Sequence, residues 1–190
     1  MEVKNDIILP NDSYNILYDE AIGNYGLITI DQAKSLGISA NTLALLARRG
    51  RLERIGHGVY RLDKYVPSAE GLDPYACAVA CVGENAYLWG PSVLAIHHLC
   101  PTNPAKIYVG TPVRYRGKSR NGIIVKDRVA RKSNTNYEGI ETQSVAEAIL
   151  SSQHLIMLDR LMDAARVANE RNMIDSVKRE QIIKELYIND

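Results

Sequence analysis

Residues 26–62 read GLITIDQAKSLGISANTLALLARRGRLERIGHGVYRL, and this stretch decides the fold. It holds two short helical patterns joined by a tight glycine turn, followed by a small hairpin that carries basic residues. That order of elements is typical of a winged helix-turn-helix, a module that usually binds duplex DNA. The stretch therefore predicts a DNA-binding regulator rather than an enzyme.

Local signals set the ends of the two helices. Thr29 is expected to begin the first, because Gln32 three residues later completes a capping box. Gly37 supplies the turn, since glycine reaches positive φ without steric cost. Ser39 is a suitable N-cap for the second helix, residues 40–49, which a glycine ends. Apolar residues at helical spacing predict its core face, which consists of Leu43, Leu46 and Ala47.

The elements around these helices complete the first predicted domain. A helix over residues 13–24 precedes them, with Ile16, Leu17, Ala21 and Ile22 as its apolar face. Strands over 52–55 and 59–62 follow, and Gly56-His57-Gly58 connects them. A stretch with Pro and Gly comes next, so we predict a winged helix-turn-helix DNA-binding domain over residues 1–65.

The remaining residues, 66–190, predict a second, regulatory domain that mixes helices with a small sheet. Its expected helices cover residues 73–82, 92–98, 144–150, 155–171 and 175–187, and its expected strands cover 106–109 and 123–126. Ser144 and Glu147 form a second capping box. The predicted fold class is therefore α+β, with the winged helix first and C-terminal helices last.

Basic residues gather in two blocks, although the formal net charge is only +1. Residues 26–65 carry seven Lys or Arg against three Asp or Glu, and residues 111–133 carry eight against one. Two such blocks on a nearly neutral chain favour a localised contact with a polyanion.

The outward face of the helix over 40–49 has the groups that a major groove requires. Asn bonds bidentately to adenine, Arg bonds to guanine or phosphate, and Leu contacts a thymine methyl. Hydroxyls and free N–H groups at a helix N-terminus bind phosphates. The candidate DNA-binding residues are Ser39, Asn41, Thr42, Leu45, Arg48, Arg49, Arg51, Arg54, His57 and Arg61. The alternative is a polar surface that contacts another protein.

The second basic block interleaves cations with Tyr115. A second nucleic-acid surface is predicted from Arg114, Arg116, Lys118, Arg120, Lys126 and Arg128. If it contacts DNA, it should steepen the salt dependence of binding. The alternative is a solvated loop and strand, because charge runs usually face water.

Other functions lack a sequence signal. No apolar run reaches the roughly 20 residues of a membrane span, and the N-terminus lacks the pattern of a secretory signal, so a cytoplasmic protein is expected. Cys77 and Cys81 lie in an apolar helix, which favours core packing over zinc binding. Phosphate-loop, dinucleotide and serine-elbow motifs are absent, as is a close carboxylate pair. We therefore expect no catalytic residue, metal or cofactor.

The segment from Tyr25 to Leu62 resembles the N-terminal winged helix of the AbiE abortive-infection antitoxins, which belong to type IV toxin–antitoxin systems. The sequence of the wing, Leu52 to Tyr60, is the most distinctive part. Parts of the second half are similar to that family's C-terminal domain. These parts are AYLWGPSVLAIHHL, KIYVGTP, GIIVKD and the segment from Gly139 to Thr142 that leads into VAEAIL. The resemblance spans about residues 13–170.

This resemblance implies a two-domain repressor and antitoxin. Its winged helix would bind inverted repeats in its own promoter, and its C-terminal domain would counter a nucleotidyltransferase-like toxin without forming a stable complex. Two other functions stay open. One is a stand-alone transcription factor whose second domain senses a ligand or a protein partner, and the other is a nuclease built on the second domain.

Overall fold

A computed structural model describes residues 10–100, 105–117, 122–133 and 135–188. The chain divides into two compact units, one up to Cys81 and one from Val82 onward. The domain assignment at residue 65 stays a prediction. None of the helices within the described ranges is both long enough and apolar enough to cross a bilayer.

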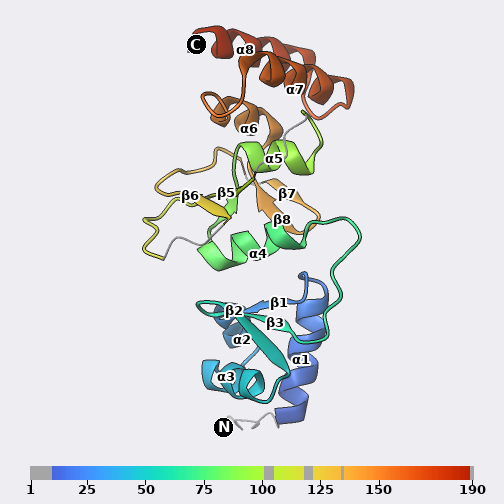
Figure 1. Cartoon of the computed structure of the whole chain (residues 1–190), viewed down its shortest axis with the longest axis vertical. Helices are drawn as coiled ribbons and strands as arrows, with labels where there is room; N and C mark the ends of the chain where they lie inside the picture. Colours follow the sequence, from blue (N-terminus) through green and yellow to red (C-terminus); the bar gives the residue numbers. More distant parts are fainter. Residues whose placement is uncertain (1–9, 101–104, 118–121, 134, 189–190) are drawn as a thin grey trace, which may run out of the picture. The chain divides into compact units, whose positions relative to one another are not determined.

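The N-terminal unit combines helices with a three-stranded antiparallel sheet of order β1-β3-β2 (Figure 1). Its elements are α1 (Pro10–Ile22), β1 (Leu27–Thr29), α2 (Ile30–Ser35), α3 (Ala40–Arg48), β2 (Leu52–Gly56), β3 (Val59–Leu62) and α4 (Asp73–Val82). This arrangement fits a winged helix, and the mixed α+β class is confirmed.

Caps fix the helix-turn-helix as the sequence predicts. The Gln32 backbone N–H donates to Thr29 Oγ1 at 3.1 Å, and the Thr29 N–H donates to Gln32 Oε1 at 2.9 Å, so the capping box is complete. Gly37 has φ +76° at the turn. Ser39 Oγ then accepts from the Thr42 N–H at 3.2 Å and starts α3. These bonds join residues close in sequence, so the caps that start α2 and α3 need no distant partner.

The core of this unit lies between α1, α3 and the sheet. Its buried members are Leu17, Ala21, Ile28, Ala33, Ile38, Leu43, Leu46, Leu52, Tyr60 and Leu62. The predicted core face of α3 is confirmed at Leu43 and Leu46, and Ala47 is partly buried against them. The prediction for Ile22 is wrong, since 52% of this residue is exposed. It follows the buried Ala21 directly, and adjacent helical residues point about 100° apart.

The tip of the β2–β3 hairpin is fixed to the start of α2. The Ile30 N–H donates to the Gly58 carbonyl at 2.9 Å. Gly58 has φ +70°, and a Cβ there would lie 3.2 Å from the Ile30 side chain. The pairing of β2 with β3 shifts register between Arg54 and Gly56, next to this turn. The wing therefore has a defined place relative to the helix-turn-helix.

Tyr65 fixes the residues that follow the sheet. Its ring lies on Gly26, where an added Cβ would come within 2.3 Å of the tyrosine Cγ. The Leu62 N–H donates to the Gly26 carbonyl at 2.9 Å, which brings the two segments together. Burial, together with the neighbouring Asp73 carboxylate, raises the pKa of Tyr65 to about 12. Tyr65 therefore ties the segment after β3 to the sheet, whereas residues 66–71 are exposed.

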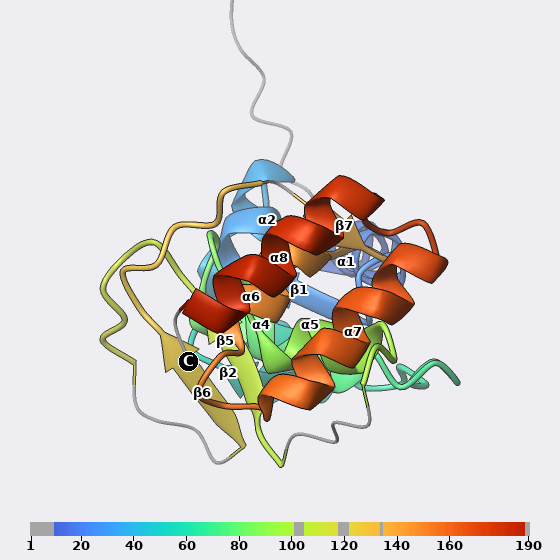
Figure 2. The same ribbon diagram turned by 90° about the horizontal axis from the view of Figure 1, so that it is seen from above.

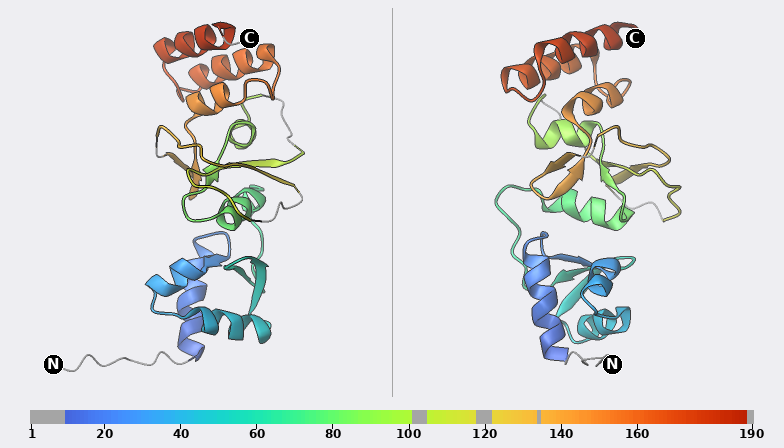
Figure 3. Two further views of the ribbon diagram at one scale, coloured as in Figure 1. Left: turned by 90° about the vertical axis from the view of Figure 1, so that its left-hand side faces the viewer. Right: turned by 180° about the vertical axis from the view of Figure 1, so that it is seen from behind.

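The C-terminal unit has a five-stranded mixed sheet of order β6-β5-β4-β8-β7. Helices α5 to α8 lie on one side of it (Figures 1 and 3), with α7 and α8 side by side (Figure 2). The elements are β4 (Tyr87–Leu88), α5 (Pro91–Ile96), β5 (Ile107–Gly110), β6 (Ile123–Lys126), β7 (Thr135–Tyr137), β8 (Ile140–Thr142), α6 (Val145–Ser151), α7 (Leu158–Glu170) and α8 (Ser176–Ile188). The predicted small sheet and C-terminal helices are confirmed.

Most boundaries in this unit lie within one or two residues of the sequence prediction, and the largest difference is at the start of α7. The helix predicted over 155–171 begins only at Leu158 as α7. His154 takes φ +66° just before it, and the turn around this residue separates α6 from α7. The capping box of Ser144 and Glu147 is confirmed at the start of α6.

Candidate nucleic-acid interface

Helix α3 presents its predicted outward face to solvent. Asn41, Arg48 and Arg49 are exposed, whereas Thr42 and Leu45 are half-buried. A helix of nine residues is roughly 13 Å long, which is enough to lie in a major groove. The face opposite the Leu43 and Leu46 packing surface is therefore open to a ligand.

The hydroxyls at the start of α3 take part in its cap. Ser39 Oγ accepts from the Thr42 N–H, and the Ser39 and Thr42 hydroxyl oxygens lie 3.0 Å apart, within hydrogen-bond distance of each other. Both side chains are therefore ordered before a ligand arrives. One of the two hydroxyl protons is used within the pair, so together they offer one proton, rather than two, to a phosphate.

The arginines around α3 differ in how firmly they are held. Arg48 and Arg49 extend into solvent, and neither side chain has a hydrogen bond or ion pair within the described ranges. The guanidinium of Arg51 lies over the Tyr14 ring, 4.8 Å from its centroid. Arg54 Nε donates to the Gly56 carbonyl at 3.2 Å. The guanidinium of Arg54 is therefore fixed at one edge, while its side chain stays exposed.

The two remaining candidates lie on the hairpin formed by β2 and β3. His57 is exposed at the turn between β2 and β3. Arg61 is half-buried on β3, the central strand, and its Nε is buried without a hydrogen-bond partner among the described residues. Glu53 is its cross-strand neighbour on β2, so an acidic group lies among these cations. Arg61 is thus less accessible to a phosphate than the exposed arginines near α3.

The structure separates the members of the second basic block. Arg114, Arg116 and Arg128 are exposed, but Lys118 and Arg120 lie outside the described residues. Lys126 is partly buried, with its Nζ 5.2 Å from the centroid of the Trp89 ring. Arg131, farther along the block, forms an ion pair with Glu141 and lies over Tyr87. Lys126 and Arg131 therefore have contacts within the C-terminal unit.

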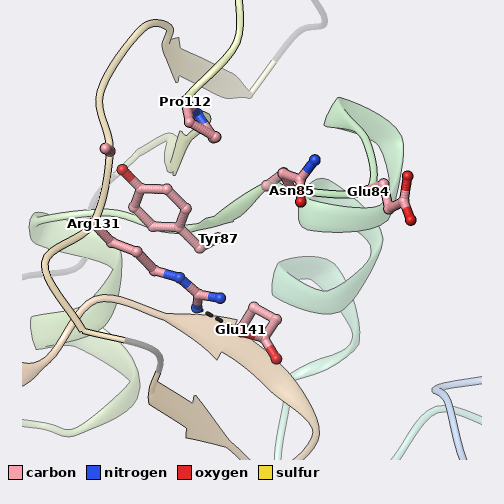
Figure 4. Close-up of a pocket in the computed structure, with 8 residues that line it drawn as sticks. Glu84, Asn85, Tyr87, Pro112, Arg131 and Glu141 are labelled. Atoms are coloured by element: carbon pink, nitrogen blue, oxygen red, sulfur yellow. Dashed lines mark ion pairs between the residues drawn. The ribbon is translucent and has the colours of Figure 1, made fainter.

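A polar cavity of about 430 Å³ lies in the C-terminal unit (Figure 4). It is lined by Glu84, Asn85, Ala86, Tyr87, Pro112, Ala130, Arg131 and Glu141. The Tyr87 hydroxyl donates to the Val129 carbonyl at 2.6 Å, and burial raises the pKa of Tyr87. The sequence contained no signal for this cavity, because its walls come from four separate segments that only the folded sheet brings together.

The cysteine and histidine residues do not form a metal site within the described part of the chain. There, no three His, Cys, Asp or Glu side chains are grouped so as to hold a metal ion. Cys77 and Cys81 are partly buried on α4, and His97 packs edge-on against the Tyr137 ring, with the centroids 4.4 Å apart. Burial, with His98 and Arg171 nearby, lowers the pKa of His97.

Comparison with known proteins found a match in the N-terminal segment. Residues 15–62, from α1 to the end of β3, match a family model described as "Transcriptional regulator, AbiEi antitoxin". The chain matches none of the curated proteins with which it was compared. The matched residues include α3 and the hairpin, and all ten candidate DNA-binding residues lie between residues 15 and 62. The resemblance read from the sequence is therefore confirmed over residues 15–62, which carry the pattern of the AbiE antitoxin family of transcriptional regulators.

Proposed function

We propose that this chain is a DNA-binding transcriptional regulator and the antitoxin of a type IV toxin–antitoxin system of the abortive-infection kind. The observation that carries the proposal is the family match over residues 15–62. The exposure of Asn41 and Arg48 on α3 supports it, because a recognition helix must leave such groups free for base edges.

In this proposal α3 enters the major groove of duplex DNA. Asn41 would pair with adenine, Leu45 would contact a thymine methyl, and Arg48 would bond to guanine or phosphate. The start of α3 and the wing would hold the DNA backbone. Thr42 and Arg49 are assigned to the major groove as well. The groups assigned to the DNA backbone are Ser39, Arg51, Arg54, His57 and Arg61.

The proposed biological role extends the family description, which names a transcriptional regulator and antitoxin. We infer that the protein represses its own operon by binding inverted repeats in its promoter, since one winged helix reads few bases. The C-terminal unit would counter a nucleotidyltransferase-like toxin without a stable complex. We assign the chain no catalytic activity or cofactor, and place it in the cytoplasm. Arg114, Arg116 and Arg128, which are exposed, are the described candidates for a second contact with nucleic acid.

The cavity beside Tyr87 and Arg131 favours a second candidate function. Its volume of about 430 Å³ falls within the usual range of small-molecule sites. A stand-alone regulator whose C-terminal unit senses a ligand would use such a cavity. A nucleotidyltransferase gene next to this gene would favour the antitoxin, and its absence would favour the sensor.

A salt titration of DNA binding tests the proposal. We expect the protein to bind a duplex taken from immediately upstream of its own gene, with an affinity that falls as salt rises. Arg54→Ala should reduce the slope of log affinity against log salt by about 0.9, because it removes one phosphate contact. Arg160→Ala, which removes an exposed cation from α7, is the matched control. Equal slopes for wild type and Arg54→Ala would remove Arg54 from the interface.

A further inference from the structure

Arg51 has a backbone that is fixed on both sides. It follows Gly50, which ends α3 with φ +71°, and it directly precedes β2. The Arg51 N–H donates to the Leu46 carbonyl at 3.0 Å, and its own carbonyl accepts from the Asp63 N–H at 3.3 Å. The position of the Arg51 Cα is therefore fixed by the end of α3 and by the residues after β3.

The side chain of Arg51 is also held, by a ring from another helix. Its guanidinium carbon lies 4.8 Å from the centroid of Tyr14 on α1. Tyr14 is partly buried and packs against the core of the N-terminal unit, so its ring cannot follow the arginine freely. Arg48 and Arg49, only a few residues earlier, have no such support among the described side chains. Arg51 is thus the oriented cation at this end of α3.

A guanidinium over a ring keeps its N–H edges available. The ring face attracts the cation, while the planar fork of donors points outward and can bond two oxygens of one phosphate. An oriented arginine also loses less rotamer freedom when it binds than a freely rotating one. We propose that Tyr14 is a positioning residue, which holds Arg51 for a phosphate of duplex DNA. This proposal rests on the proposed function above.

The test compares four single variants and one double variant of the full-length chain with wild type, on the labelled duplex from upstream of its gene. Tyr14→Leu removes the ring and should weaken binding about three- to fivefold, which corresponds to the usual strength of an exposed cation–π contact. Tyr14→Phe keeps the ring and should bind within twofold of wild type. Tyr187→Leu is the matched control: it removes an exposed tyrosine from α8 of the C-terminal unit, and no cation lies over its ring among the described residues.

The fourth variant, Arg51→Gln, separates a DNA contact from a contribution to folding. It should reduce the salt slope by about 0.9. Tyr14→Leu added to Arg51→Gln should then change affinity by less than twofold, because no guanidinium is left to orient. A purely structural Tyr14 would instead weaken binding equally in both backgrounds, and that result overturns the proposal. An unchanged affinity for Tyr14→Leu overturns it as well.

A replacement variant and the binding of the wild-type protein itself complete the test. If Tyr14→Leu does not fold, as judged by its thermal melt, Arg51→Lys takes its place. Lysine keeps the charge but not the planar fork, so we expect weaker binding at an unchanged salt slope, whereas binding equal to wild type contradicts the proposal. A wild-type protein that fails to bind the duplex overturns the proposed function and the role of Tyr14 together. Wild-type binding with no effect at Tyr14 overturns the role of Tyr14 alone.

Discussion

Arg48→Ala combined with Arg54→Ala is expected to weaken binding to the upstream duplex by about 30- to 100-fold, which corresponds to roughly 2–2.7 kcal/mol. Both side chains are exposed, one on the outward face of α3 and one on β2. Each lost contact is expected to cost about 1–1.4 kcal/mol, which lies within the net range of a typical hydrogen bond, because both side chains are exposed and screened by salt. A gel-shift titration at fixed salt measures the effect.

The matched control for this double variant removes the same charge elsewhere. Arg160→Ala with Lys184→Ala takes two exposed cations from α7 and α8 of the C-terminal unit. We expect its affinity to stay within about twofold of wild type, because these residues lie outside the proposed interface. Wild-type affinity in the Arg48 and Arg54 double variant would remove α3 and the wing from the DNA-binding surface.

The two arginines should differ in their effect on sequence preference. Arg48, on α3, is proposed to reach a base edge, so Arg48→Ala should lower the ratio of specific to non-specific binding. Arg54, on the wing, is proposed to hold phosphate, so its loss should weaken binding to all sequences about equally.

Gly26→Ala is expected to lower the free energy of unfolding of the N-terminal unit by about 3 kcal/mol, which is a large fraction of the stability of a small domain. Gly26 has φ +67°, a conformation that costs an L-residue roughly 1–2 kcal/mol. The new Cβ would also come within 2.3 Å of Cγ in the Tyr65 ring, so Tyr65 must leave its place. Urea unfolding followed by circular dichroism measures the change.

Gly50→Ala provides the control for Gly26→Ala. Gly50 has φ +71°, but nothing lies within 4 Å of the position its Cβ would take. This variant should therefore show only the conformational cost of about 1–2 kcal/mol. If Gly26→Ala costs no more than Gly50→Ala, Tyr65 does not contribute to the stability of this unit.

The sequence predicted the elements that depend on local bonds. Thr29 with Gln32, and Ser144 with Glu147, are capping boxes that involve residues three apart, and both occur as predicted. Gly37 and Gly50 follow helices and adopt positive φ. Glycine takes this conformation without steric cost, so the residue type alone predicts where these helices end. Helical spacing likewise predicted which residues of α3 face away from the core.

The features that the sequence did not predict depend on distant partners. Strand β7 has three residues and β4 has two, which is too short for a period to be visible, and both exist through pairing within the sheet. The contacts of Tyr65 with Gly26 and of Arg51 with Tyr14 join residues 39 and 37 positions apart. The polar cavity likewise needs the folded sheet. No local pattern encodes such contacts.

A footprint on the DNA immediately upstream of the gene tests the central claim most directly. We expect the wild-type protein to protect paired inverted half-sites whose centres are separated by about 10 base pairs or a multiple of that spacing. The variant with Arg48→Ala and Arg54→Ala should leave the same DNA open at the same protein concentration. Absence of protection, or equal protection of unrelated DNA, would contradict a sequence-specific regulator that reads DNA through α3.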